Sequence, residues 1–226
     1  MAHLYAMYND DDNYRPVSPY LSIEDLTDDA VFQMARFPRH DVVALCDMLR
    51  LDLERKTARS RPIPVDTQVL AALGFYASGS FQWVLGRGIG LSQTSMSRVI
   101  RDVTTSLCRH ADEVIQFQTS QHDVIANKHA FHAIAGFPNV IGAVDGTHIP
   151  IKSPITHEEA YVNRKGIHTI NIQAVCDSKL QLLDVVAKLP GSTHDAFMWR
   201  SCSLRRLMEL GYIHGGWLLG TFYPML

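Results

Sequence analysis

The spacing of apolar residues changes along this chain, and the change predicts two kinds of secondary structure. In the first half, apolar residues recur at helical spacing, most clearly over residues 66–78 (DTQVLAALGFYAS), where good helix formers also dominate. In the second half the apolar runs are short and rich in β-branched residues, as over 140–152, 169–177 and 182–188. We therefore expect helices first, and then three successive strands that pair as antiparallel neighbours.

The C-terminal part predicts one more helix and one more strand. Residues 194–210 have a helical pattern that ends at Gly211, a favourable residue directly after a helix. The apolar stretch 216–220 (GWLLG) then predicts a fourth strand. Together these elements predict an α/β sheet layer in the second half of the chain.

The N-terminal region predicts an acidic arm followed by two helices. Ser22 is a candidate N-cap, with Asp25 three residues later, for a helix over residues 23–37. Residues 41–53 (DVVALCDMLRLDL) predict the second helix. The link that follows is basic, and we favour a solvated linker over a phosphate-binding patch because mixed charge runs usually lie on the surface. The cations of this link are Arg55, Lys56, Arg59 and Arg61.

A helix, a tight turn and a second helix are predicted over residues 81–107. A short helix at 81–86 is followed by a turn through Gly88 and Gly90, and Ser92 is placed to cap the long helix after it. This second helix begins with hydroxyl and amide side chains, including Gln93 and Ser95, and continues with Arg98 and Arg101. Such a pattern is typical of a recognition helix that reads DNA. An ordinary helical hairpin explains the same pattern, and periodicity does not separate the two.

Composition limits the class of protein. The apolar content of 46% and charged content of 19% are those of a globular protein, and a formal net charge of -2 leaves nucleic-acid contacts to local basic patches. The four cysteines are widely separated, which favours reduced thiols in a cytosolic or nuclear protein. No apolar run reaches the ~18–20 residues that span a bilayer, and the N-terminus lacks a secretory pattern. We expect no membrane association.

Two aspartates are candidates for metal chemistry. Asp145 lies within an otherwise apolar strand and is followed by Gly146, which lets a ligand or backbone approach, and by His148 on the same face as that glycine. Asp195 lies at a candidate helix start. Carboxylates suit Mg²⁺, which activates water in phosphodiester cleavage. Alternatively, Asp145 is a hydrogen-bonding strand residue and Asp195 a first-turn acid that favours the helix dipole.

The ordered motifs then point to a family. Three blocks, VIGAVDGTHIPIKSP, YVNRKGIHTINIQAVCDSKLQLLDV and LPGSTHDAFMWRSC, resemble consecutive motifs of the Harbinger transposase-derived nucleases. The helical segment over residues 66–100 resembles the helix-turn-helix segment of the same family. The resemblance covers nearly the whole chain after the first forty residues.

This resemblance implies a ribonuclease-H-like fold, a mixed sheet with flanking helices, preceded by an all-α helix-turn-helix-like region. It also implies an acidic triad that holds divalent cations (Mg²⁺ or Mn²⁺), DNA as substrate, a Myb-like DNA-binding protein as partner, and a location in nucleus and cytoplasm. Asp145 matches the first acid of the triad and Asp195 matches a metal-associated acid, so both are the expected catalytic and metal-binding residues.

The chain departs from the family pattern after residue 220. The family continues with an acid in a Gly-Asp-x-Gly-Tyr turn, whereas Thr221, Phe222 and Tyr223 follow here. We therefore expect a C-terminally truncated form with an incomplete sheet and acidic site, and weak or no nuclease activity. The alternative is a non-catalytic DNA- or protein-binding module. The expected divisions are an arm with helices over 1–64, a helical region over 65–135 and a partial endonuclease domain over 136–226.

Overall fold

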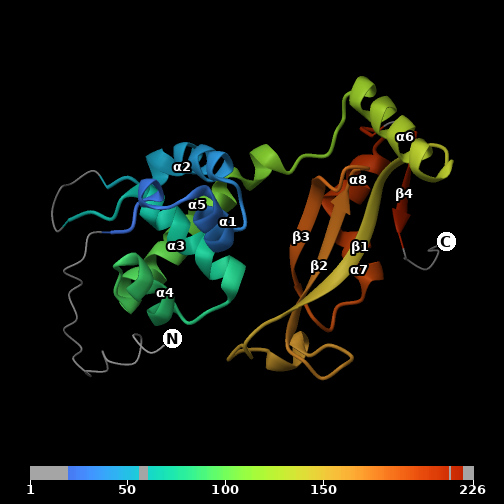
Figure 1. Cartoon of the computed structure of the whole chain (residues 1–226). Coiled ribbons are helices and arrows are strands. Elements are labelled where there is room, and N and C mark those ends of the chain that lie inside the picture. The colour runs from blue at the N-terminus through green and yellow to red at the C-terminus, as the bar shows by residue number, and fades with distance from the viewer. Residues whose placement is uncertain (1–19, 56–60, 214, 221–226) are drawn as a thin grey trace. The chain divides into compact units, whose positions relative to one another are not determined.

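The computed structural model describes residues 20–55, 61–213 and 215–220 (Figure 1), and these fall into two compact units that divide between Ala111 and Asp112. The first unit is helical. Its elements are η1 (Ile23–Asp25), α1 (Asp28–Ala35), α2 (Arg39–Leu53), α3 (Val65–Ser78), α4 (Gln82–Ile89) and most of α5 (Gln93–Val114). None of the helices in the described ranges is long and apolar enough to cross a membrane.

Helix α3 is the centre of the helical unit. Every residue from Thr67 to Gly74 is buried, so the helix is covered on all sides, as its apolar composition predicts. Its buried amide is satisfied, because Gln68 Nε2 donates to the carbonyls of Leu53 and Ile63 at 3.2 and 2.9 Å. Gln68 therefore joins the end of α2 to the chain that enters α3.

The predicted helix over residues 23–37 is wrong as one element. The Ser22 cap is confirmed, and Ser22 and Asp25 form a complete capping box, but the helix they start is a single 3₁₀ turn. Thr27 then caps α1 by accepting a hydrogen bond from Ala30 N at 3.2 Å. A second capping side chain so close to the first ends one helix and starts another.

The predicted helix, turn and helix after residue 81 are present as α4 and α5. The turn is shorter than expected, since Gly88 lies inside α4 and only Gly90 takes the left-handed conformation, with φ 81°. Ser92 Oγ accepts from Ser95 N at 3.2 Å and so caps α5 as predicted. A Cβ on Gly86 would lie 2.6 Å from the Leu91 carbonyl oxygen, so the turn requires glycine there.

The second unit is a four-stranded sheet with helices. The sheet order is β3-β2-β1-β4, in which β2 pairs antiparallel with β1 and with β3, while β4 runs parallel to β1. The predicted strands and the mixed α/β sheet are therefore confirmed. Its elements are α6 (Gln121–Ala135), β1 (Val140–Pro150), η2 (Glu158–Tyr161), β2 (Thr169–Cys176), β3 (Leu182–Pro190), α7 (Asp195–Ser201), α8 (Ser203–Glu209) and β4 (Trp217–Gly220).

The predicted helix over 194–210 is also divided. Cys202 has extended backbone angles (φ -80°, ψ 148°) and separates α7 from α8. Its thiol accepts a hydrogen bond from Arg205 N at 3.4 Å and so starts the second helix. The break lets both helices bury a side chain, because Met198 of α7 and Leu204 of α8 are almost fully buried.

Helix α6, which the sequence analysis did not predict, is tied to the sheet by one buried amide. Asn127 Nδ2 donates to the Ile141 carbonyl at 2.7 Å, next to the irregularity between Val140 and Gly142 in the β1–β4 register. Asn127 Oδ1 also accepts from Ser178 N at 3.4 Å. The amide thus joins α6, β1 and the turn between β2 and β3.

Asn127→Ala should destabilise this unit. The substitution leaves the buried Ile141 carbonyl without its donor, which costs about 1–3 kcal/mol. Chemical denaturation of the purified chain measures the loss. His129→Ala, on an exposed position of the same helix, is the control and should change the midpoint little; equal shifts in the two variants would show that the Asn127 hydrogen bonds contribute nothing.

Candidate functional site

Asp145 lies in the central strand of the sheet, where both neighbouring strands meet it. It pairs with Ala174 of β2, and the preceding residue, Val144, pairs with Gly220 at the end of β4. The Asp145 side chain is exposed, and its Oδ1 accepts a hydrogen bond from Gly146 N at 2.9 Å. An exposed carboxylate in a central strand is accessible to a cation and to a substrate.

The opposite face of β1 carries the second aspartate. A Cβ added to Gly146 would lie 3.0 Å from Asp195 Oδ1, so the carboxylate at the start of α7 rests directly over this glycine. We predicted that Gly146 lets a ligand or backbone approach, and the group that approaches it is instead the Asp195 side chain. His148 lies on this face as predicted, with its Nδ1 3.0 Å from Thr169 Oγ1 of β2.

Asn171 of β2 holds Asp195 in place. Its Nδ2 donates to Asp195 Oδ1 at 3.0 Å and to the Thr193 carbonyl at 2.9 Å. The Asn171 side chain is fully buried, and so is that of Gln173 two residues on. Sequence reasoning missed Asn171, although a polar residue within the β-branched run TINIQ was a signal that this strand carries more than core packing.

The two aspartates lie on opposite faces of β1. Successive residues of a strand point to opposite faces, so Asp145 points away from the face on which Asp195 contacts Gly146. In the part of the chain that the structure describes, no three His, Cys, Asp or Glu side chains gather as a metal-binding group. A metal shared by Asp145 and Asp195 stays a prediction.

The loop before β2 carries two exposed cations at its tip. Asn163 Oδ1 accepts from Lys165 N at 2.8 Å and from Ile167 N at 3.2 Å, which fixes a tight turn. Arg164 and Lys165 are exposed at its tip. The loop base is held by His168 Nε2, 2.9 Å from Glu158 Oε1.

Comparison with known proteins agrees with this architecture. Residues 144–221 match the family model described as DDE superfamily endonuclease. The chain is 43% identical over 198 residues to "Putative nuclease HARBI1" of Homo sapiens, an alignment that covers 88% of this chain and 57% of the relative, and the figures for Bos taurus are the same. It is 26% identical over 197 residues to "Protein ALP1-like" of Arabidopsis thaliana, covering 84% of this chain and 47% of that protein. No solved structure matches.

The matched segment begins within β1 and includes Asp145, so this part of the sheet unit is similar to the DDE superfamily endonucleases. Over the aligned residues the chain is HARBI1-like. The chain spans about 57% of the length of the HARBI1 relatives.

Two substitutions of Asp195 distinguish the stability contributed by its hydrogen bond from that contributed by its charge. Asp195→Ala removes the acceptor for Asn171 and a favourable first-turn charge, and should destabilise the sheet unit by about 1 kcal/mol. Asp195→Asn keeps an oxygen for Asn171 Nδ2 and should lose less. Urea denaturation of both variants measures the difference. If Asp195→Asn is as destabilised as Asp195→Ala, the Asn171 hydrogen bond does not hold the helix.

A third carboxylate, Asp184 of β3, is half-buried, and burial raises its pKa above the usual value. Its Oδ2 is buried without a hydrogen-bond partner in the described ranges. Because the folded state holds the proton more tightly than the unfolded chain, the ionised group costs stability at neutral pH, and the cost disappears as pH falls below the ordinary Asp value of about 3.9.

Asp184→Asn should therefore raise the unfolding midpoint at pH 7, with a gain that shrinks as the pH is lowered. Denaturation curves at several pH values measure this dependence. Glu159→Gln, with its carboxylate on the surface, is the matched control and should show no such pH-dependent gain; a gain at pH 7 that persists unchanged in acid would contradict the argument.

Proposed function

We propose that the chain derives from a metal-dependent DNA endonuclease whose reaction centre is built around Asp145. The observation that carries this proposal is the position of Asp145, exposed in the central strand beside the end of the parallel strand β4, within the segment that matches the endonuclease family. DDE nucleases use divalent metals, and such ions activate water and stabilise the leaving oxygen of a phosphodiester. Asp145 is the residue we expect to bind Mg²⁺ or Mn²⁺.

The polypeptide of residues 1–226 does not, by this proposal, cleave DNA by itself. Two cations about 3.5–4 Å apart need several carboxylates, whereas Asp195 lies over Gly146 and points from the face opposite to Asp145. Position 221, where the family resemblance implies an acid, carries a neutral threonine; its placement lies outside the described residues. A hydroxyl does not offset the charge of a second cation.

We expect no Mg²⁺- or Mn²⁺-dependent cleavage of duplex or single-stranded DNA by the purified 226-residue polypeptide. The assay incubates each substrate with each metal, beside Asp145→Ala as control. Cleavage that disappears in the Asp145→Ala control would show that the site is competent and that this proposal is wrong.

A gain-of-binding variant tests the role of Asp145 independently of cleavage. Thr221→Asp restores the acid that the family resemblance implies, and should tighten Mn²⁺ binding about tenfold or more, because a second carboxylate adds charge and a ligand. Calorimetric titration with Mn²⁺ measures it. Thr221→Asn is the neutral control, and adding Asp145→Ala to Thr221→Asp should remove the gain. A gain that survives without Asp145 would place the ion elsewhere.

The second candidate function is a non-catalytic DNA-binding module. It is favoured by the helical unit, in which α4 and α5 form a helix, turn and helix and Arg98 is exposed near the start of α5. DNA binding that persists in EDTA, without cleavage when metal is added, distinguishes it from the first. A Myb-like partner and a location in nucleus and cytoplasm are proposals from the family resemblance, which co-purification and cell imaging test.

A further inference from the structure

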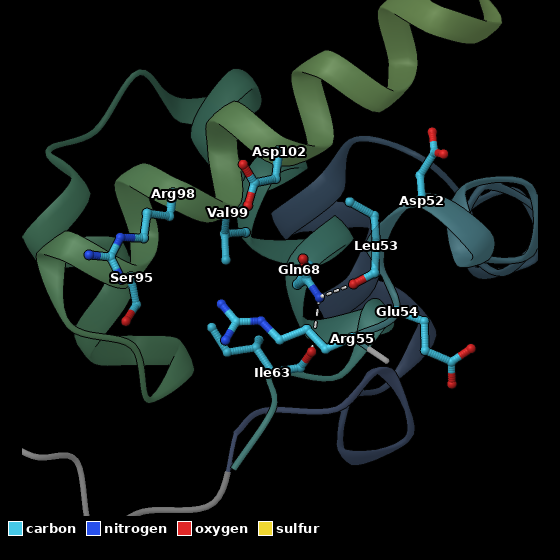
Figure 2. A pocket seen from close by; sticks show the side chains of 10 residues that line it. All are labelled: Asp52, Leu53, Glu54, Arg55, Ile63, Gln68, Ser95, Arg98, Val99 and Asp102. Carbon is cyan, nitrogen blue, oxygen red and sulfur yellow. Dashed lines mark hydrogen bonds between the residues drawn. The ribbon is translucent and has the colours of Figure 1, made fainter. Parts of the chain in front are cut away.

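The helical unit contains a cavity of about 190 Å³ between the end of α2 and the first turns of α5 (Figure 2). It is smaller than the ~300–1,000 Å³ of small-molecule sites, and therefore suits one group of a larger ligand. Its walls combine charged, polar and apolar side chains from α2, the segment before α3, α3 itself and α5. They are Asp52, Leu53, Glu54, Arg55, Ile63, Gln68, Ser95, Arg98, Val99 and Asp102.

Two guanidinium groups line this cavity without a carboxylate partner. Arg55 follows α2 and Arg98 lies on α5; both side chains are exposed, and neither forms an ion pair within the residues that the structure describes. In Figure 2 the guanidinium of Arg55 points toward the side of the cavity where Arg98 and Ser95 lie. A guanidinium offers only donors, in a planar fork that fits phosphate oxygens.

The acids of the cavity do not neutralise this side. Asp52 accepts a hydrogen bond from Ser106 at 2.7 Å and lies 3.3 Å from Arg109, and Asp102 lies 3.4 Å from Arg101.

The remaining acid, Glu54, points away from the guanidinium of Arg55 in Figure 2. The positive side of the cavity is therefore open to an anion.

Ser95 adds a neutral donor at the same place. Its backbone N–H is already occupied by Ser92 Oγ, so the helix N-terminus contributes little. Ser92 Oγ also donates to Ser95 Oγ at 3.1 Å, which leaves the Ser95 hydroxyl proton to be donated elsewhere. The amide nitrogen of Gln68, which also lines the cavity, donates to the Leu53 and Ile63 carbonyls and is therefore not counted as a ligand donor.

We propose that this cavity binds one backbone phosphate of duplex DNA, with Arg55 and Arg98 as the charged donors and Ser95 as the neutral donor. The inference rests on the proposed function only in that the chain acts on DNA. Ser95 and Arg98 are on the second helix of the helix-turn-helix, and a phosphate fixed beside such a helix orients it on the duplex. The basic link that we interpreted as solvated thus contributes one phosphate ligand, Arg55.

The structure distinguishes two arginines that the sequence grouped together. Arg101 has its Nε 3.4 Å from Asp102 and does not line the cavity, whereas Arg98 lines it. Both are exposed residues of α5, so a substitution of either removes one positive charge from the same helix. Arg101→Gln is therefore the matched control for Arg98→Gln.

The test measures binding of a labelled duplex to the full 226-residue chain in EDTA, by fluorescence anisotropy over a range of salt concentrations. Arg55→Gln and Arg98→Gln should each weaken binding about tenfold and reduce the salt slope, and because they share one phosphate their two reductions should together amount to about 0.9. Arg101→Gln should weaken binding less than about twofold, because its charge is already paired. Glu54→Gln should bind more tightly than the original chain.

The proposal is wrong if the original chain does not bind duplex DNA, or if Arg55→Gln and Arg98→Gln leave the affinity and the salt slope unchanged. It is also wrong if Arg101→Gln loses as much affinity as these variants, because the loss then reports only the total charge of the chain. Equal or tighter binding of single-stranded RNA in the same assay overturns the assignment to duplex DNA. The unfolding midpoint of each variant checks the fold, and chemical shifts of the Ser95 amide during titration with inorganic phosphate locate the site. Since EDTA removes the metal, none of these results depends on nuclease activity.

Discussion

The sheet unit depends on β1 being paired along both edges. Its antiparallel ladder with β2 fixes which residues share a face, and its parallel pairing with β4 brings the end of that strand beside Val144. The residue after Val144 is Asp145, the exposed carboxylate of β1. Asp145 therefore lies between β2, with which it pairs, and the end of β4. The buried amide of Asn127 ties α6 and the turn between β2 and β3 to this frame, and that of Asn171 ties the start of α7 to it.

The pairing of β1 also separates the two aspartates. Gly146 leaves room on one face for the Asp195 carboxylate, which Asn171 then holds against the sheet. Asp145 keeps the other face. An arrangement that hydrogen-bonds one carboxylate to a buried amide uses that carboxylate to position α7, and the metal ion that we propose would then be bound by Asp145.

The two units carry different chemical groups, which agrees with separate roles in the function that we propose. The helical unit has paired most of the acids around its cavity with cations of its own, leaving Arg55 and Arg98 available to an anion. The sheet unit has an exposed acid at its centre. Contacts to phosphates position a protein on nucleic acid without requiring a metal, so the DNA binding that we propose for the helical unit does not depend on the metal site that we propose for the sheet unit.

The sequence by itself determined the class of structure. The change of apolar spacing predicted helices before strands, the Ser22 and Ser92 caps were readable from local chemistry, and the ordered motifs identified the family. The tertiary structure decided the rest: the break at Cys202, the amide that holds Asp195, and which of Arg98 and Arg101 lines the cavity. Local patterns carry propensity and periodicity, whereas a side chain's partners come from segments far away in the chain, and only the folded contacts choose among them.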